Sequence, residues 1–277
     1  MAVAQCYHPP VFPSSTGVTG GMSRLRRTAE LVVMLAPREL RVRYRQSSLD
    51  IAWALISPVV VLIVYGFILT QSFDVKGACA PYLTSAWTGL VIWTFFATAV
   101  GGAVTSLIAS ADLITKVYFP REALPLAMAT AALADLAVGM ITLLVLMLIQ
   151  GVSIGIAAVA TLLPIAVIVV WSAAISVFVG VLAAFARDTV HGVHLLLRVG
   201  FFATPVMYEA SFLPSQFAWS ANVNPVAVAI TGVRSALLCN EWPNWQLLLI
   251  QLGAGLAALA AALWYTARVE PRITDVV

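Results

Sequence analysis

The chain has 277 residues, of which 61% are apolar and only 10% are charged. Soluble domains contain about 45–50% apolar and about 25% charged residues, so this chain cannot cover itself with polar surface. Its formal net charge of +3 is too small to indicate a nucleic-acid partner, and we exclude that class. The long uncharged runs predict instead an all-α membrane protein surrounded by membrane lipids.

The residues before the first apolar run divide into a tail and a basic helix. Residues 1–23 are rich in Pro and Gly, which predicts a disordered tail, and Met22 offers an alternative start. They lack the basic start and apolar centre of a secretory signal peptide. Residues 24–36 carry arginines on one face and leucines on the other, which predicts an amphipathic helix along the membrane surface. Pro37 is expected to break this helix.

Six apolar segments are long enough to cross the hydrocarbon core, which needs about 20 helical residues. Seven of the fifteen Lys and Arg residues precede the first segment, and five more follow the second, fourth and sixth segments. The positive-inside rule then places both termini in the cytoplasm and predicts a multi-pass protein of the plasma (inner) membrane. The six predicted spans cover residues 51–70, 87–108, 125–149, 163–185, 190–208 and 245–266.

The stretch between the fifth and sixth spans contains an apolar segment, residues 225–238, that is too short for a seventh span. Its 14 residues make about 21 Å of helix, against a hydrocarbon core of about 30 Å. Asn224 can cap this helix, Pro225 suits its first turn, and Arg234 interrupts its apolar surface. We therefore expect residues 211–221 and 225–238 to form re-entrant helices that dip in from the outer face. Irregular backbone at that depth indicates a functional region.

The sequence contains none of the common catalytic or nucleotide-binding motifs. A G-x-x-x-x-G-K-[ST] phosphate loop, an H-E-x-x-H zinc motif and a G-x-S-x-G nucleophile elbow are absent. The three cysteines, Cys6, Cys79 and Cys239, have no metal-ligand spacing. We interpret them as free, with Cys79 and Cys239 the only pair expected on the outer side. The chain is therefore predicted to be no enzyme and to hold no metal and no cofactor of its own.

The loop between the second and third spans reads SADLITKVYFPREALPLA from Ser110 to Ala127 and is expected on the cytoplasmic side. Ser110 can cap a helix of one or two turns, Asp112 suits its positive end, and Lys116 suits its negative end. A plain connection between two spans is the alternative. The face that such a helix would offer to a partner outside the membrane is apolar and consists of Leu113, Ile114 and Val117.

Four segments carry a family resemblance in chain order. They are RELRVRYRQSSLDIAWALISP, KVYFPREALPLA, NPVAVAITGVRSALL and RVEPRITDVV. Together they resemble the transmembrane subunits of type-2 ABC exporters, in the branch that exports O-antigen, teichoic acid and other lipid-linked polysaccharides. The resemblance covers residues 24–277, which would form the transmembrane domain. It implies a homodimer with a separate nucleotide-binding ATPase subunit, on which ATP and Mg²⁺ bind, and a lipid-linked glycan as substrate.

The resemblance also implies roles for particular residues. Spans one and five would line the translocation path, and the helix at 24–36 would be a second contact with the ATPase. The region 225–238, with Pro225 and Arg234, would form an outer gate. The residues implied in coupling to the ATPase are Asp112, Leu113, Ile114, Lys116, Val117 and Tyr118.

The sequence leaves the substrate open among several classes. The arginine-rich bias makes a cell-wall galactan a reasonable expectation, and the resemblance also implies an O-antigen-like glycan as a possible substrate. The same superfamily exports drugs, haem and lipids, and a membrane-embedded glycosyl- or acyltransferase is the alternative from another class. A neighbouring gene for a Walker-motif ATPase would favour an exporter, and its absence would favour an enzyme.

Two ionisable residues, Asp135 and Arg198, lie deep in predicted spans, where a charge facing lipid costs about 2.5–3.5 kcal/mol. Their depths are similar, so two interpretations remain. They form an ion pair between the third and fifth spans, or Arg198 faces the path and attracts a pyrophosphate-linked substrate. His191 and His194 share a helical face with Arg198, which predicts a polar stripe near the cytoplasmic mouth. A metal site would need a third ligand.

Aromatic side chains suit a carbohydrate path, because the C–H faces of sugars pack on rings without fixed polar partners and a polymer can slide. For each such residue, ordinary packing or a place in the interfacial aromatic belt is the alternative. The predicted path residues are Trp53, Tyr65, Phe67, His191, His194, Arg198, Phe201, Phe202 and Tyr208.

Overall fold

The computed structural model describes residues 18–45, 79–110, 120–209 and 218–276, together with Val60, Val64 and Gln216. Side chains are described only over 24–42 in the first of these ranges and up to residue 270 in the last. The predicted first span therefore lies outside the described residues, apart from Val60 and Val64. The central part of the predicted coupling loop, residues 111–119, also lies outside them.

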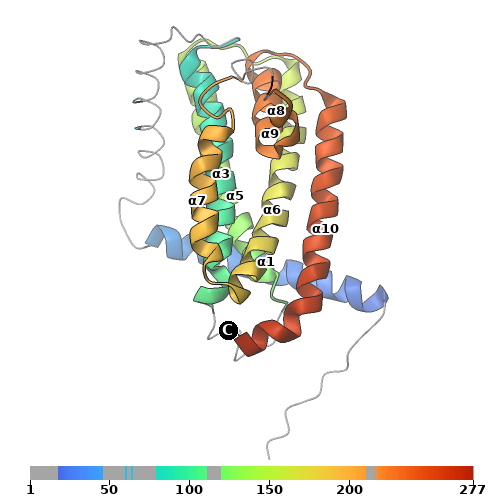
Figure 1. Cartoon of the computed structure of the whole chain (residues 1–277). Helices are drawn as coiled ribbons and strands as arrows, with labels where there is room; N and C mark the ends of the chain where they lie inside the picture. The colour runs from blue at the N-terminus through green and yellow to red at the C-terminus, as the bar shows by residue number, and fades with distance from the viewer. Residues whose placement is uncertain are drawn as a thin grey trace, which may run out of the picture.

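Four helices of the described residues are long and apolar enough to cross a membrane, and no strand occurs among these residues. Helix α3 packs against both α5 and α6, and α6 packs against α10. Figure 1 shows the four standing side by side as a bundle. They correspond to the predicted second, third, fourth and sixth spans, so the prediction of an all-α membrane protein is confirmed. Their bounds are Tyr82–Ala109 (α3), Ala123–Ile149 (α5), Leu162–Phe185 (α6) and Trp245–Val276 (α10), with a short 3-10 helix at Ile156–Thr161 leading into α6.

Small residues let these helices approach closely, as is common where helices pack within a membrane. Gly180 of α6 lies against Pro125 of α5, and a Cβ atom at Gly180 would stand 2.7 Å from Pro125 Cγ. Gly139 of α5 lies in the same way against Val91 of α3, where a Cβ atom would stand 2.7 Å from Cγ1. Substitution of either glycine would therefore push two helices of the bundle apart.

Helix α1 (Val18–Arg45) lies across one end of the bundle, and α10 ends at the same side (Figure 1). A helix is present at residues 24–36, as predicted, but both of its predicted ends were wrong. It begins at Val18, so residues 18–23 are helical and not part of a disordered tail, and it continues through Pro37. Proline inside a helix removes one backbone hydrogen bond and its ring crowds the carbonyl four residues earlier, so this continuation needs support from packing. The Pro37 carbonyl accepts a bond from Arg41 Nε at 3.2 Å.

The region between the fifth and sixth predicted spans is more broken than expected. Helix α7 (Thr189–Ala203) ends five residues early, and residues 204–208 form an irregular turn. Short helix α8 (Ala218–Val223) covers the last four residues of the predicted helix at 211–221, and residues 211–215 and 217 lie outside the described residues. The predicted helix at 225–238 is confirmed as α9 (Pro225–Val233), continued by a π-helical turn at Arg234–Leu238.

Cys79 and Cys239 form a disulfide, with their Cα atoms 4.9 Å apart, so the interpretation of these two cysteines as free was wrong. They are 160 residues apart in sequence, and only the packing of the segment before α3 beside the end of α9 brings them together. Cys79 lies three residues before α3 begins and Cys239 directly follows the π-helical turn after α9, and Figure 1 shows the start of α3 at the end of the bundle opposite α1. We call the two ends the disulfide end and the α1 end.

Replacing Cys79 by Ser is expected to lower the free energy of unfolding by about 2–5 kcal/mol, because the bond closes a long loop of the unfolded chain. Thermal unfolding of the purified protein, with and without reductant, measures the effect, and Cys6→Ser is the control. If Cys79 and Cys239 both react with a maleimide in the absence of reductant, they are free thiols and the prediction is wrong.

Candidate functional site

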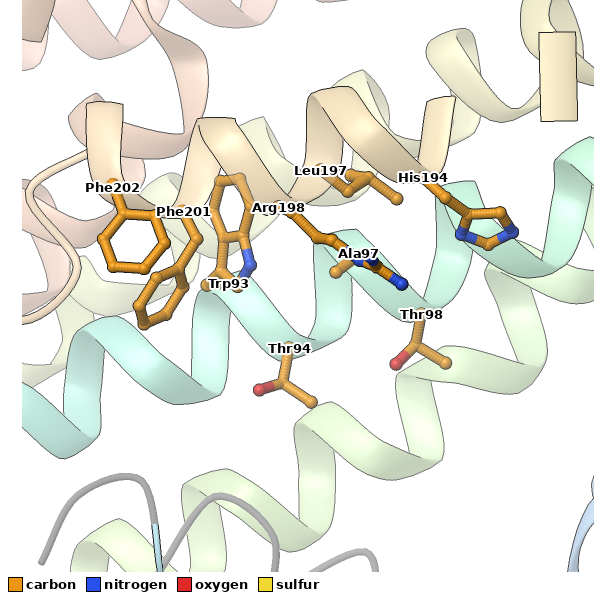
Figure 2. A pocket seen from close by; sticks show the side chains of 9 residues that line it. All are labelled: Trp93, Thr94, Ala97, Thr98, His194, Leu197, Arg198, Phe201 and Phe202. Carbon is orange, nitrogen blue, oxygen red and sulfur yellow. The ribbon is translucent and has the colours of Figure 1, made fainter. Parts of the chain in front are cut away.

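A groove of about 490 Å³ runs between α3 and α7. Figure 2 shows its side chains extending from both helices toward the same space. Its volume lies within the range of about 300–1,000 Å³ typical of ligand sites. The lining residues are Trp93, Thr94, Ala97 and Thr98 from α3, and His194, Leu197, Arg198, Phe201 and Phe202 from α7.

The part of the groove nearer the disulfide end is aromatic. The Trp93 ring centroid lies 5.9 Å from that of Phe201 in an edge-to-face arrangement, and the Phe201 centroid lies 5.3 Å from that of Phe202. Gly200 permits this packing, since a Cβ atom there would stand 3.0 Å from Trp93. Phe202 itself is 62% exposed, so one ring remains open to a ligand or a neighbouring segment.

The part nearer the α1 end carries the polar side chains of His194 and Arg198 from α7 and of Thr98 from α3, and Thr94 lies beside Trp93 on α3 (Figure 2). Arg198 lies about 13 Å along α7 from its first residue and Phe202 about 20 Å, by helix rise. The groove therefore changes from charged to aromatic along its length, and Arg198 is exposed within it.

Among the described residues, Arg198 forms no ion pair with Asp135. The reason is topological, since Asp135 belongs to α5, whereas α7 packs on α3 and α6. Of the two sequence interpretations, this arrangement favours Arg198 facing the groove. His191 is exposed but does not line the groove. No group of three metal-binding side chains occurs in the part of the chain that the structure describes.

The other predicted path residues do not line the groove or lie outside the described residues. Tyr208 belongs to the turn after α7, where its hydroxyl donates to the Phe202 carbonyl at 3.1 Å. Trp53, Tyr65 and Phe67 lie outside the described residues.

Sequence reasoning missed the α3 wall of the groove. A signal was present, since Trp93, Thr94, Ala97 and Thr98 recur at i, i+1, i+4 and i+5 on one helical face. The predicted coupling residues Asp112, Leu113, Ile114, Lys116, Val117 and Tyr118 also lie outside the described residues.

The turn at residues 204–208 is held by Arg234, which is only 8% exposed. The Arg234 guanidinium donates to the carbonyls of Pro205 at 3.1 Å, Val206 at 2.6 Å and Tyr208 at 3.0 Å. Its Nε also donates to the Ser85 carbonyl of α3 at 3.1 Å. The remaining carbonyl at this level, that of Met207, accepts a bond from the Tyr82 hydroxyl at 2.8 Å. Non-helical backbone inside a membrane protein needs such internal partners, because lipid offers none.

The corner between α8 and α9 is held in a similar way. Asn224 caps α9 by accepting from the backbone N–H groups of Val226 and Ala227, as expected, and its side-chain amide donates to Thr204 at 2.8 Å. The Gln251 amide of α10 donates to the last two carbonyls of α8, Asn222 at 2.9 Å and Val223 at 3.1 Å. Gln251 lies about 9 Å along α10 from its start, so the corner is below the disulfide end of the bundle.

The sequence model of the ABC-2 type transporter family matches residues 30–238. The chain is 26% identical over 248 residues to the O-antigen export system permease protein RfbA of Klebsiella pneumoniae, covering 89% of this chain and 95% of that protein. It is 29% identical over 238 residues to the protein of the same name from Myxococcus xanthus, covering 84% and 89%. Because the family match includes both walls of the groove and the Arg234 turn, and leaves out only the two ends, the chain belongs to the ABC-2 type transporter family.

Proposed function

We propose that this chain is the membrane subunit of an ATP-driven exporter that moves a lipid-linked polysaccharide across the plasma membrane. The observation that carries this proposal is the groove between α3 and α7, which combines an exposed cation with aromatic rings in a member of this family. The relatives named above are permeases for O-antigen export, and their alignments cover most of this chain. A separate ATPase subunit would bind ATP and Mg²⁺, and two copies of this chain would form the path.

We place the α1 end in the cytoplasm and the disulfide end outside. The basic residues that precede the first span support this orientation through the positive-inside rule. The disulfide supports it independently, because such bonds persist in oxidising compartments and are rare in the cytoplasm. Both termini would then be cytoplasmic, and a substrate would meet Arg198 and His194 before the aromatic residues.

The two halves of the groove suit the two parts of such a substrate. The Arg198 guanidinium can donate paired hydrogen bonds to phosphate oxygens, which fits a diphosphate between lipid and glycan. The rings of Phe201 and Phe202 offer packing surface for sugar C–H faces without fixed polar partners. At the disulfide end, we assign the outer gate to the α8–α9 corner at Pro225, with Arg234 holding the wall beside it.

Reconstitution tests this proposal directly. The chain, expressed with the ATPase encoded beside it, is expected to co-purify with that ATPase. In proteoliposomes, lipid-linked glycan is expected to stimulate ATP hydrolysis severalfold and to appear across the bilayer only when ATP is present. Stimulation by a drug or a free lipid but not by the glycan would contradict the proposed substrate. Glycosyl or acyl transfer without any ATPase would contradict the exporter function itself.

A further inference from the structure

A half-buried arginine and two buried carboxylates join three helices at the α1 end. The Arg24 guanidinium of α1 donates to both carboxylate oxygens of Glu122, each at 2.8 Å. Its Nη2 also lies 2.9 Å from Glu270 Oε2, and the Thr28 hydroxyl donates to Glu122 at 3.3 Å. The side chains of Glu122 and Glu270 are 3% and 9% exposed. We call this cluster of Arg24, Thr28, Glu122 and Glu270 the Arg24 clamp.

The positions of these residues along the chain make the clamp more than a local contact. Glu122 is the residue just before α5 and follows the loop at 111–119 by three residues. Glu270 lies near the end of α10, and Arg24 lies in the first half of α1. The clamp therefore connects the surface helix, the exit of the cytoplasmic loop and the last helix of the bundle.

Apolar packing beside the clamp joins the same elements. Leu31 and Leu35 of α1 pack on a cluster that includes Leu124 of α5, together with Tyr265 and Val269 of α10. These leucines follow Arg24 and Thr28 on one face of α1, since residues 24, 28, 31 and 35 share a face of a helix. A displacement at the start of α5 would consequently reach α1 and α10 together.

The charges of the clamp depend on one another. Both carboxylates contact the Arg24 guanidinium, and the hydrogen bonds that Arg24 donates to Glu122 raise the pKa of Arg24 above its usual range, so Arg24 stays charged at any physiological pH. Burial raises the pKa of Glu270, and the charges of Arg24 and Arg121 oppose this rise. Without Arg24, the two buried carboxylates would lose the hydrogen-bond donor that ties α1 to both of them.

We propose that the Arg24 clamp transmits motion from the start of α5 to α1 and α10, and so couples ATP hydrolysis on the partner subunit to transport. The inference rests on the function proposed above. Arg24 acts as a positioning residue, because it does not line the groove. A purely structural tie would affect the amount of folded complex, whereas a coupling tie affects the quantity of glycan moved for each ATP hydrolysed.

The test compares three variants in the reconstituted complex with its ATPase. Arg24→Gln is expected to retain ATP hydrolysis within about twofold of wild type while the glycan exported per ATP falls at least tenfold. Glu270→Gln keeps the Arg24–Glu122 pair and loosens only α10, so a severalfold fall is expected. Arg26→Gln is the matched control, because Arg26 lies on the same helix in an exposed pair with Glu30, and it is expected to behave as wild type.

The outcomes separate the clamp from the proposed function. Wild-type export per ATP in both Arg24→Gln and Glu270→Gln overturns the coupling role, as does a parallel fall of hydrolysis and export. If Arg24→Gln does not accumulate, Glu270→Gln decides the question alone. Wild-type complex that shows no ATP-dependent glycan export refutes the proposed function, whatever the variants do.

Discussion

Replacement of Arg234 by Met is expected to destabilise the folded chain by about 3 kcal/mol or more and to deplete it from the membrane. The carbonyls of Pro205, Val206 and Tyr208 in the turn would lose this donor, and the Ser85 carbonyl would keep only its helical partner in α3. Each unsatisfied buried acceptor costs about 1–3 kcal/mol. Methionine fills similar space, so the loss reports on hydrogen bonds more than on packing.

Arg234 and the turn that it holds pack tightly against α3. A Cβ atom at Gly89 of α3 would overlap the Val206 carbonyl oxygen and stand 2.9 Å from Arg234 Nη2. The turn thus lies directly on α3. Lysine at position 234 would keep the charge, but its single ammonium cannot reproduce the planar arrangement of donors, and an intermediate loss is expected.

Thermal unfolding of the detergent-purified chain measures this effect, followed by intrinsic fluorescence of its eight tryptophans. Arg268→Met is the control, because Arg268 is exposed and its guanidinium lies 4.3 Å above the Trp264 ring, where the contact contributes about 0.5–1 kcal/mol. An unfolding temperature for Arg234→Met equal to that of the control would show that the buried carbonyls find other partners.

Replacement of Arg198 by Gln is expected to reduce export about ten- to a hundredfold while leaving the unfolding temperature unchanged. Arg198 is exposed in the groove, so its replacement leaves no buried polar group without a hydrogen-bond partner. A hydrogen bond to a charged group contributes about 1.5–3 kcal/mol, and each 1.36 kcal/mol corresponds to a factor of ten in rate. Arg198→Lys retains the charge and is expected to recover part of the activity.

A second substitution in the groove separates the aromatic contribution from that of the charge. Phe202→Ala removes the most exposed ring and is expected to slow export severalfold. Leu196→Ala is its matched control, since Leu196 is 70% exposed on the same helix but does not line the groove. Transport assays in proteoliposomes measure both variants. Equal effects of the two alanine substitutions would mean that the exposed surface of α7 serves packing, and the groove would lose its proposed role.

Local patterns in the sequence were sufficient for the helices and for the single cap that depends on nearby residues. The runs that became α3, α5, α6 and α10 are apolar enough to be recognised by length alone. Asn224 and Pro225 mark the start of α9, because a capping residue acts on backbone groups two and three positions ahead. Helical periodicity also placed His191, His194 and Arg198 on one face of α7, but only His194 and Arg198 of this predicted stripe line the groove.

Contacts between distant residues needed the tertiary structure. The helix at residues 18–45 passes through Pro37 because α1 packs on α5 and the cluster around Leu124, and such packing outweighs a local helix-breaking tendency. Span five ended early at Ala203, since Arg234 and Tyr82 together supply donors for the carbonyls of residues 205–208. No sequence pattern near residue 204 predicts that Arg234 and Tyr82 will donate to these carbonyls.

By itself, then, the sequence determined that this chain is a helical membrane protein, where its long helices lie, and which face of α7 is polar, because hydropathy and helical period are local properties. Only the tertiary structure decided the partners across the bundle. It paired Cys79 with Cys239 and brought Arg24 to Glu122 and Glu270. It also placed Arg198 in the groove beside α3 and not beside Asp135. Arg24 and Glu122 are 98 residues apart and the two cysteines are 160 apart, and helix packing, which no local pattern encodes, brings them together.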